Sequence, residues 1–417
     1  MSTATLCAID AAPPRAVATD RFSAPAVMAV IACGIGNIIG VTTIVNATFS
    51  GFLVPVSGDL GLSRSAFTFV LTLISVLGLV AYPVSGRLID RFGPRPVALA
   101  GNLLFGLSVA GLGLVSAKLW VLYGLFALMG VLATLPGTVL FARVVSTWFF
   151  AHRGLVLGLS GGVAFGIGGM IVPPFAEAVM QAWGWRAAYV GLGVLTIAVG
   201  QPVFWLWLKE APRGGPAAAP AALTGLSRAE AMRTPAFWIL LVGVAVGAGS
   251  TSSVITHMIP LAAERGFGFA TALSALSALY AANAIWQTAL GALLDRLGMA
   301  RIAALFVLPG MAGAWLLNSA HSEGQVILGA LLVGLSAGTE YGLVPFCIPR
   351  YFGFRCYGEI YGVIFGMIML LQGLSPFLMD LAYDLTGNYH PALAAFSFTL
   401  LGCAGVIAFL PRFGPRP

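Results

Sequence analysis

The sequence predicts an all-α integral membrane protein with twelve transmembrane helices in two six-helix halves, and with both termini in the cytoplasm. Three observations lead to this prediction. The 417-residue chain is 59% hydrophobic and only 8% charged, whereas ordinary soluble domains carry about 25% charged residues. Apolar runs of about 20 residues, the length that crosses a bilayer, recur along the chain. The basic residues gather on one side of these runs.

The apolar runs between charged, proline or glycine breaks give the spans in order. They are approximately 26–48, 65–85, 96–116, 119–141, 154–177, 187–208, 236–258, 269–291, 300–318, 325–347, 359–380 and 391–410. The stretch 209–234 is too polar and too rich in Pro, Gly and Ala to span a membrane. We therefore expect a cytoplasmic tail (1–24), an N-terminal half (25–208), a cytoplasmic linker (209–234), a C-terminal half (235–411) and a second tail (412–417). Ser227 is expected to cap a short surface helix in the linker.

Orientation follows from arginine and lysine, which concentrate in cytoplasmic loops. With both termini inside, 17 of the 21 basic residues lie on the inner side, and only Arg64, Lys118, Arg186 and Arg265 lie outside. We expect all 21 to lie in loops or at span ends. The first 24 residues lack the order of a cleaved signal peptide, so the first span would be its own insertion signal. The expected location is the bacterial inner membrane.

Several classes of function are excluded by composition and spacing. The net charge of +7 comes from basic residues scattered between apolar spans, and not from the continuous basic face that nucleic acid requires. The five cysteines form no C-x-x-C pair, and no His/Cys cluster has metal-ligand spacing. No nucleophile–base pair or phosphate loop indicates an enzyme. We expect a monomer without catalytic residues, metal or cofactor, whose partners are the lipid bilayer and a small-molecule substrate.

The chain contains an internal repeat. "GRLIDRFGPRPVALA" begins at Gly86 and "GALLDRLGMARIAAL" begins at Gly291, and each follows the second span of its half. The residues shared at equal offsets include Gly86/Gly291, Asp90/Asp295, Arg91/Arg296 and Gly93/Gly298. Two parallel halves of this kind place a substrate site between them near the bilayer midplane and alternate access by rocking.

The duplicated G-x-L-x-D-R-x-G, followed by basic residues, resembles the signature loop of the major facilitator superfamily. The resemblance covers the chain from about Arg21 to Pro411. It implies a cytoplasmic gate in which Gly86 lets span two approach the opposite half. Asp90 would then lie at the N-terminus of span eleven, where a carboxylate is stabilised.

The same resemblance gives roles to the other charged residues of the two loops. Arg91 and Arg95 would pair with carboxylates or lipid headgroups, while Asp295 and Arg296 would act against span five. The simpler interpretation is that the arginines only keep these loops inside.

Three further stretches resemble the monocarboxylate and oxalate/formate exchanger branch of this superfamily. They are "STWFFAHRGLVLGLSGG" (146–162), "MRTPAFW" (232–238) and "RYFGFRCYGEIYG" (350–362). The resemblance implies transport of small organic carboxylates, often with a proton. That branch commonly holds Lys or Arg inside spans eight or eleven, whereas span eight and the interior of span eleven (362–378) are uncharged here.

Ionisable residues inside a membrane are costly, which makes them functional candidates. Glu340 is the only acidic residue predicted well inside a span, and it is a candidate proton-coupling site. The alternative is a structural carboxyl that is hydrogen-bonded to a neighbouring helix. His257 ends span seven and is the other candidate proton carrier, with a solvated interfacial ring as its alternative.

Neutral polar residues mark the helices expected to line a substrate pathway. Spans one and seven carry polar clusters in equivalent halves, and spans eight, ten and eleven add amides and aromatic residues. The candidates are Asn37, Thr43, Asn46, Ser252, Asn283, Trp286, Gln287, Tyr341 and Gln372. Such an uncharged pocket fits a neutral or amphipathic ligand as well as an anion. Helix packing through small residues competes with this interpretation.

The predicted function is secondary active transport of a small organic solute, with a monocarboxylate as one candidate, by proton symport. A proton-driven efflux antiporter for apolar or amphipathic compounds is the first alternative, and the glycine-rich span five keeps it open. A non-transporting membrane sensor is the second alternative. The proton gradient is the expected energy source.

Overall fold

The structure is a computed structural model that describes residues 22–62, 64–115, 119–211 and 225–413. These residues form α1 (Ala24–Ile38), α2 (Phe49–Leu60), α3 (Arg64–Phe92), α4 (Pro94–Leu112), α5 (Leu119–Ala133), α6 (Thr138–Trp148), α7 (Arg153–Gly158), α8 (Ala164–Trp207), α9 (Arg228–Ala231), α10 (Pro235–Thr256), α11 (Met258–Glu264), α12 (Phe269–Leu297), α13 (Ala303–Asn318), α14 (Glu323–Tyr351), α15 (Tyr357–Thr386) and α16 (His390–Ala408). Most of the predicted N-terminal tail, the middle of the linker and the last four residues lie outside the described residues.

The predicted all-helical membrane architecture is confirmed. Among the described residues, ten stretches are long and apolar enough to cross a membrane. One of them, Arg153–Trp207, is 55 residues long. At 1.5 Å per residue it would extend about 80 Å, far more than a bilayer core of about 30 Å. It is not one straight helix, because Gly184 has non-helical angles (φ 84°, ψ 169°) inside α8.

The count of ten differs from the predicted twelve for two reasons. The fifth and sixth predicted spans fall in the single stretch Arg153–Trp207, and the eighth coincides with α12, which is not among the ten. Most predicted spans begin within three residues of a helix start, but the second, fourth, eighth and eleventh end six or seven residues before α3, α6, α12 and α15 do. Twelve spans in two six-helix halves therefore remain a prediction.

The first predicted span is interrupted in the middle. After α1 the chain enters η1, a π-helix from Thr42 to Ala47, and then α2. The hydroxyl of Thr43 donates to the carbonyls of Ile38 and, at 3.1 Å, of Gly40. The Thr43 hydroxyl therefore bonds to carbonyls in the segment where the chain changes from the α-helix α1 to the π-helix η1. A second π-helix, η2 (Leu159–Val163), separates α7 from α8, and such segments are frequent at functional sites.

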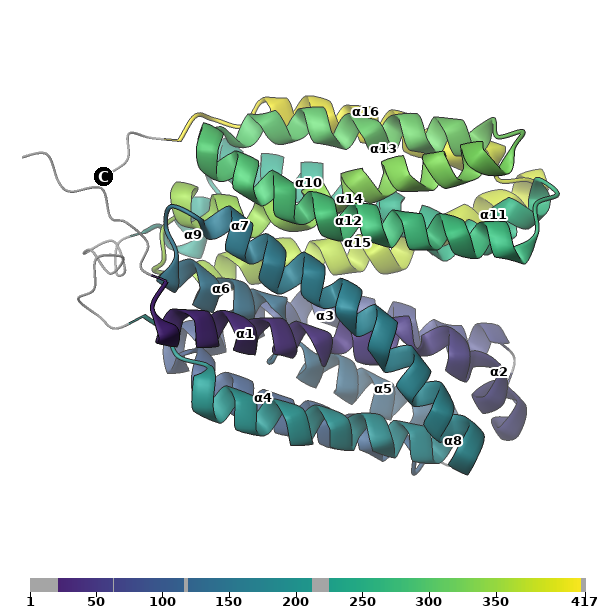
Figure 1. Ribbon diagram of the computed structural model, residues 1–417, viewed down its shortest axis with the longest axis horizontal. Coiled ribbons are helices and arrows are strands. Elements are labelled where there is room, and N and C mark those ends of the chain that lie inside the picture. Colours follow the sequence, from purple (N-terminus) through teal and green to yellow (C-terminus); the bar gives the residue numbers. More distant parts are fainter. Residues whose placement is uncertain (1–21, 63, 116–118, 212–224, 414–417) are drawn as a thin grey trace, which may run out of the picture.

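The helices form two groups that lie against each other (Figure 1). The N-terminal group comprises α1–α8 with η1 and η2, and the C-terminal group comprises α10–α16. Two helix pairs join the groups along their length: α3 packs against α15, and α7 packs against α12. The end of the bundle where α9 lies is called the gate end below, and the opposite end, with α2 and α11, is called the far end (Figure 1).

At the far end, each group is tied within itself by a carboxylate. Asp59 of α2 accepts bonds from the Arg186 guanidinium at 2.5 Å and from the Trp185 indole at 3.2 Å, both just after Gly184. Glu264 of α11 accepts the Tyr389 backbone N–H at 3.3 Å, where α16 begins. The two groups thus repeat one arrangement, because in each a carboxylate at the end of a short helix holds the start of the group's last long helix.

The predicted cap in the linker is confirmed. The Ser227 hydroxyl accepts the Glu230 backbone N–H, and the Glu230 carboxylate accepts the Ser227 backbone N–H at 2.7 Å, which forms a capping box. These bonds from Ser227 lower the pKa of the Glu230 carboxyl. The short helix α9 is therefore fixed at the gate end, and its first residue, Arg228, contacts Glu359 of α15 at 3.3 Å.

Candidate functional site

A small cavity of about 20 Å³ lies between the two groups. Its lining comes from α1, α6, α7, η2 and α8 on one side and from α12, α14 and α15 on the other. The residues are Asn37, Thr138, Ala142, Leu157, Ser160, Gly161, Phe165, Gln287, Pro345 and Tyr361. None of these ten side chains is charged. The structure therefore holds a neutral, partly aromatic cavity where the two groups meet.

Asn37 orders the N-terminal side of this cavity. It is 4% exposed. Its amide nitrogen donates to the Ser160 carbonyl at 2.8 Å, and its oxygen lies 3.5 Å from the Thr138 hydroxyl. Ser160 belongs to η2, so the amide of Asn37 joins α1 to the π-helical segment. Asn37 was a predicted site residue, whereas Thr138 and Ser160 were not.

Gln287 supplies the amide on the opposite side. It is 5% exposed, and its side chain makes no hydrogen bond with any residue that the structure describes. The amide lies over two glycines of η2. A Cβ added to Gly162 would lie 2.7 Å from Oε1 of Gln287, and one added to Gly161 would lie 3.2 Å from its Nε2. The absence of side chains at these two positions therefore makes room for the Gln287 amide.

The remaining neutral candidates lie elsewhere. The Ser252 hydroxyl donates to the Gln372 carbonyl at 3.1 Å and so ties α10 to α15. The Trp286 ring packs on Phe306 with centroids 4.9 Å apart, and its indole nitrogen is buried without a partner among the described residues. None of these residues lines the cavity.

Four further candidates complete the predicted polar set. Thr43 is buried and bonded to its own helix, Asn46 is exposed, and Asn283 is half-buried. The side chain of Tyr341 lies outside the described residues. The part that any of these residues takes in transport stays a prediction.

Glu340 is buried inside the C-terminal group, away from the cavity between the groups. It is 2% exposed. Its oxygens accept bonds from the hydroxyls of Thr251 on α10 at 3.0 Å and of Ser336 on its own helix at 3.4 Å. Gly247 leaves room for it, because a Cβ there would lie 2.7 Å from Oε1. The carboxyl thus joins α14 to α10 through the Thr251 hydroxyl, and it forms no ion pair with any described residue.

His257 is also buried, with 5% exposure, and it does not line the cavity. It lies at the break between α10 and α11, where its Nδ1 is 2.9 Å from the Ser253 carbonyl. Its ring lies against Tyr389, with centroids 5.6 Å apart. The alternative of a solvated interfacial ring does not describe this position, because protein covers the ring.

At the gate end, Asp90 reaches the other group. Its carboxylate accepts the backbone N–H groups of Gly358 and Glu359 at 3.1 and 3.0 Å, which are the first-turn donors of α15. These N–H groups have no partner within their own helix, and the positive end of the helix dipole favours a carboxylate. The structure therefore places Asp90 where the resemblance implied, although its gating role stays a prediction.

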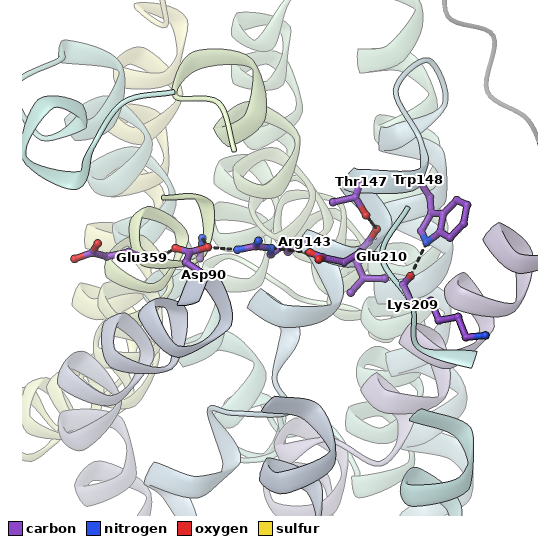
Figure 2. A network of polar contacts seen from close by, with 9 residues as sticks. Asp90, Arg143, Thr147, Trp148, Lys209, Glu210 and Glu359 are labelled. Atoms are coloured by element: carbon purple, nitrogen blue, oxygen red, sulfur yellow. Dashed lines mark hydrogen bonds and ion pairs between the residues drawn. The ribbon is translucent and has the colours of Figure 1, made fainter. Parts of the chain in front are cut away.

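Arg143 extends this contact into a network (Figure 2). Its guanidinium pairs with Asp90 on one side and with Glu210 at 3.1 Å on the other. The Trp148 indole donates to the Lys209 carbonyl at 2.6 Å and fixes the same segment after α8. The expectation that every basic residue lies in a loop or at a span end is wrong for Arg143. It lies inside α6, because that helix continues to Trp148, seven residues beyond the predicted end.

Glycine pairs allow the two groups to approach closely at the gate. A Cβ added to Gly86 would fall inside the backbone of Gly358, and one added to Gly291 would fall inside the backbone of Gly154. Gly86 and Gly291 are the equivalent first residues of the two motif copies. Both copies therefore bring their helix against the backbone of a helix in the opposite group.

The second copy follows the first at its carboxylate. Asp295 accepts the Leu155 backbone N–H in the first turn of α7 at 3.1 Å. Its other oxygen lies 3.7 Å from Arg350, which is an ion-pair distance and too long for a hydrogen bond. Nearby, Arg153 is 2% exposed and donates to the carbonyls of Phe149 and Ser146 at 3.1 and 3.2 Å.

For the other motif residues the structure shows different contacts, and the pairing of Arg91 and Arg95 with lipid headgroups stays a prediction. Arg95 donates to the Trp205 carbonyl and Arg91 lies over the Phe92 ring at 5.3 Å, and neither forms an ion pair with a carboxylate of the described residues. Arg296 is exposed. Gly93 and Gly298 end their helices with φ of 82° and 63°, a conformation that glycine adopts without strain.

Several functional candidates were not predicted from the sequence. Arg143 and Arg153 were counted only as inner basic residues, although both are largely buried. Thr138, Ser160 and Tyr361 line the cavity without an obvious signal in the sequence. Among the described residues, no group of three or more His, Cys, Asp or Glu side chains could hold a metal ion.

Comparison with known proteins gives consistent results. The sequence profile of the Major Facilitator Superfamily matches residues 35–376. The chain is 29% identical over 353 residues to human Monocarboxylate transporter 11, covering 80% of this chain and 72% of that protein. It is 27% identical over 191 residues to the Oxalate:formate antiporter of Oxalobacter formigenes, covering 45% of this chain and 44% of that protein.

The fold is also similar to solved structures. The human organic anion transporter MFSD10 superposes with a TM-score of 0.71 at 15% identity, covering 92% of this chain and 100% of the other. The Escherichia coli fucose:proton symporter superposes with a TM-score of 0.64 at 15% identity, covering 93% of this chain and 97% of the other. At this identity the likeness concerns the fold alone.

Proposed function

Because the chain belongs to the Major Facilitator Superfamily, we propose that it moves a small organic solute across a membrane by alternating access. In this proposal the solute is carried by proton symport, and the proton gradient is the energy source. The carrying observation is the cavity between the two groups, next to a gate end where two copies of one motif join these groups. A transporter needs a site that both groups share and a barrier that can open on one side. This arrangement suits both requirements.

The proposal includes a topology. Twelve spans in two six-helix halves, 25–208 and 235–411, would be joined by the cytoplasmic linker 209–234. The gate end would then face the cytoplasm, and the membrane would be a bacterial inner membrane. The supporting observations are the distribution of basic residues and the parallel repeat of the gate motif. In this orientation the described conformation is closed toward the cytoplasm.

Proton coupling is assigned to Glu340, with His257 as the second candidate. Burial penalises the charged form of a carboxyl, so Glu340 can take up a proton when the surrounding helices exclude water. Thr251, which donates to it, belongs to α10, and α10 packs against α15 of the gate. Proton binding at Glu340 would therefore act on a helix that contacts a gate helix, without requiring Glu340 to touch the solute.

The names of relatives suggest the kind of solute. Human Monocarboxylate transporter 11 and the Oxalate:formate antiporter point to small organic acids. A second candidate function is efflux, because the Fujikurins efflux protein of Gibberella fujikuroi is 31% identical over 169 residues, which cover 39% of this chain and 33% of that protein. The two candidates differ in the direction in which protons and solute move.

The test uses purified protein in liposomes that contain a pH-sensitive dye, with protein-free liposomes to correct for passive permeation. Symport acidifies the lumen when a transported acid is added outside. Proton antiport makes the lumen more alkaline under the same conditions. An unchanged luminal pH for every solute, together with no counterflow of labelled solute, would contradict the proposal.

A further inference from the structure

The amide of Gln287 borders the cavity and has no hydrogen-bond partner among the described residues. Buried polar groups in proteins are nearly always hydrogen-bonded, because an unpaired group loses its bonds to water without replacement. Gln287 is 5% exposed and bonds to no described residue, yet it lies at the wall of the cavity. Asn37, on the facing side, already uses its amide on Ser160 and Thr138. Gln287 therefore has hydrogen-bonding capacity left for a molecule in the cavity, which at about 20 Å³ holds about one water in this conformation and must widen for a larger solute.

The surroundings of Gln287 restrict the charge of that molecule. None of the ten lining residues is charged. Two other buried charged residues, Glu340 and Arg153, do not line the cavity, and both are bonded elsewhere. Glu340 bonds to Thr251 and Ser336, and Arg153 bonds to two backbone carbonyls. An anion here would be desolvated without a cation, which is strongly unfavourable. The cavity is therefore suited to an uncharged group.

A primary amide offers two N–H donors beside a carbonyl acceptor. Its full complement is a planar group that carries one acceptor and one donor side by side. An undissociated carboxylic acid and a carboxamide both have this arrangement, whereas a carboxylate has acceptors only. With a carboxylate, the Oε1 of Gln287 would face negative charge and find no donor.

Resting on the proposed transport function, we propose that Gln287 is the substrate-recognition residue and that it binds an uncharged acid or amide group through paired hydrogen bonds. A carboxylic acid bound in this way crosses with its own proton, so the solute itself would contribute to proton coupling. A carboxamide would bind equally well and carry no titratable proton. The glycines at 161 and 162 belong to this site, because they leave the space that the Gln287 amide occupies.

Binding can be measured separately from transport, through the melting temperature of the purified wild-type protein. The probes are L-lactamide, its N,N-dimethyl derivative, which has no donor, and L-lactate at pH 4 and pH 7.5. Ligands that bind the folded state raise the melting temperature. We expect lactamide to bind at both pH values, at least about tenfold more tightly than lactate at pH 7.5 or the dimethylamide, because the unmatched probes leave Gln287 unpaired. Lactate should bind at pH 4.

Three variants test the assignment. Gln287→Leu should lose lactamide binding by about tenfold or more. Thr288→Val is the matched control on the same helix, because its hydroxyl bonds only to the Ala284 carbonyl at 3.1 Å, and it should bind like the wild type. Gln287→Lys should reverse the preference and bind lactate at pH 7.5. Melting temperatures without ligand show whether each variant is folded, and the wild-type comparison stands without them.

The inference is overturned if lactate at pH 7.5 binds the wild type as well as lactamide, if the dimethylamide binds equally, or if no probe binds. Unchanged lactamide binding by Gln287→Leu would also overturn it. These results differ from failure of the proposed function, which the liposome assay reports. A protein that accumulates a permanently ionised acid, such as a sulfonate, in liposomes would refute this recognition scheme and leave the transport function standing.

Discussion

Replacing Asp90 by asparagine tests whether the gate contact controls the balance between open and closed states. The carboxylate accepts two N–H groups at the start of α15, at 3.1 and 3.0 Å, and pairs with Arg143. Hydrogen bonds to a charged group contribute about 1.5–3 kcal/mol each, and a carboxylate at a helix N-terminus adds about 0.3–1 kcal/mol. Asparagine keeps the shape and one acceptor oxygen, so it loses one of the two bonds and the charge.

The side chain of Asp90 is 15% exposed, so we take the lower part of these ranges. We expect the closed state to lose about 2–3 kcal/mol of stabilisation relative to the open state. The ratio of closed to open molecules should then fall by about 30- to 150-fold. Gly358 and Glu359 belong to the other group, so this loss acts on the contact between the groups and leaves each group folded.

The assay is the distance distribution between two spin labels at the gate end, measured by pulsed electron resonance. Phe92 and Leu297 are suitable positions, because they end equivalent helices of the two groups and are 57% and 42% exposed. The five native cysteines are replaced first. Asp90→Asn should shift the distribution to longer distances, while Asp59→Asn, which loosens a contact within one group at the far end, should not. An unchanged distribution in Asp90→Asn would refute the gating argument.

Three further predictions concern other parts of the chain. Glu340→Gln cannot titrate and should abolish pH-driven accumulation of lactamide, which carries no proton of its own, in liposomes while sparing binding; intact accumulation would return this residue to a structural role. Gly291→Leu should reduce flux by about 5- to 150-fold, because overpacking costs about 1–3 kcal/mol. Gly402→Leu, where an added Cβ meets nothing within 4 Å, should transport normally, and equal rates in the two variants would contradict the interlocking of backbones. Cysteines placed at 212–224 should react with impermeant reagents only from the cytoplasmic side, and labelling of intact cells from outside would invert the proposed topology.

The gate was predictable in part, because its signal is repeated in the sequence. Two copies of one motif after equivalent spans pointed to Asp90 and Asp295, and the structure places both at helix N-termini of the opposite group. Arg143 was missed because it is separated from Asp90 by 53 residues and reads as one more inner basic residue. Only the three-dimensional arrangement shows that its guanidinium lies between Asp90 and Glu210.

The cavity was less predictable, because polarity along a helix does not say which side chains remain free. Asn37 and Gln287 were among the candidates and do line the cavity. Thr256 and Ser253, in the same polar cluster as Ser252, bond to carbonyls four residues earlier in their own helix. A hydroxyl that is satisfied in this way needs no cavity, so a polar cluster in the sequence overestimates the number of ligand contacts.

The span count shows a similar limit. An apolar run indicates that a segment lies in the membrane, but the turn between two runs depends on backbone angles. Gly184 makes that turn within "AWGWRAA", where no proline or charge cluster marks a long loop. Predicted spans five and six nevertheless lie on either side of Gly184, because this glycine and Arg186 break the apolar run.

The two far-end carboxylates have a practical consequence. In a rocking mechanism only contacts between the groups must break in each cycle, and the contacts of Asp59 and Glu264 stay within their own groups. Contacts that stabilise each group therefore lie at the far end, whereas the contacts that must break during turnover lie between the groups. Reinforcing α2 and α11 should yield a hardier protein for crystallisation or cryo-microscopy that still cycles at its natural rate.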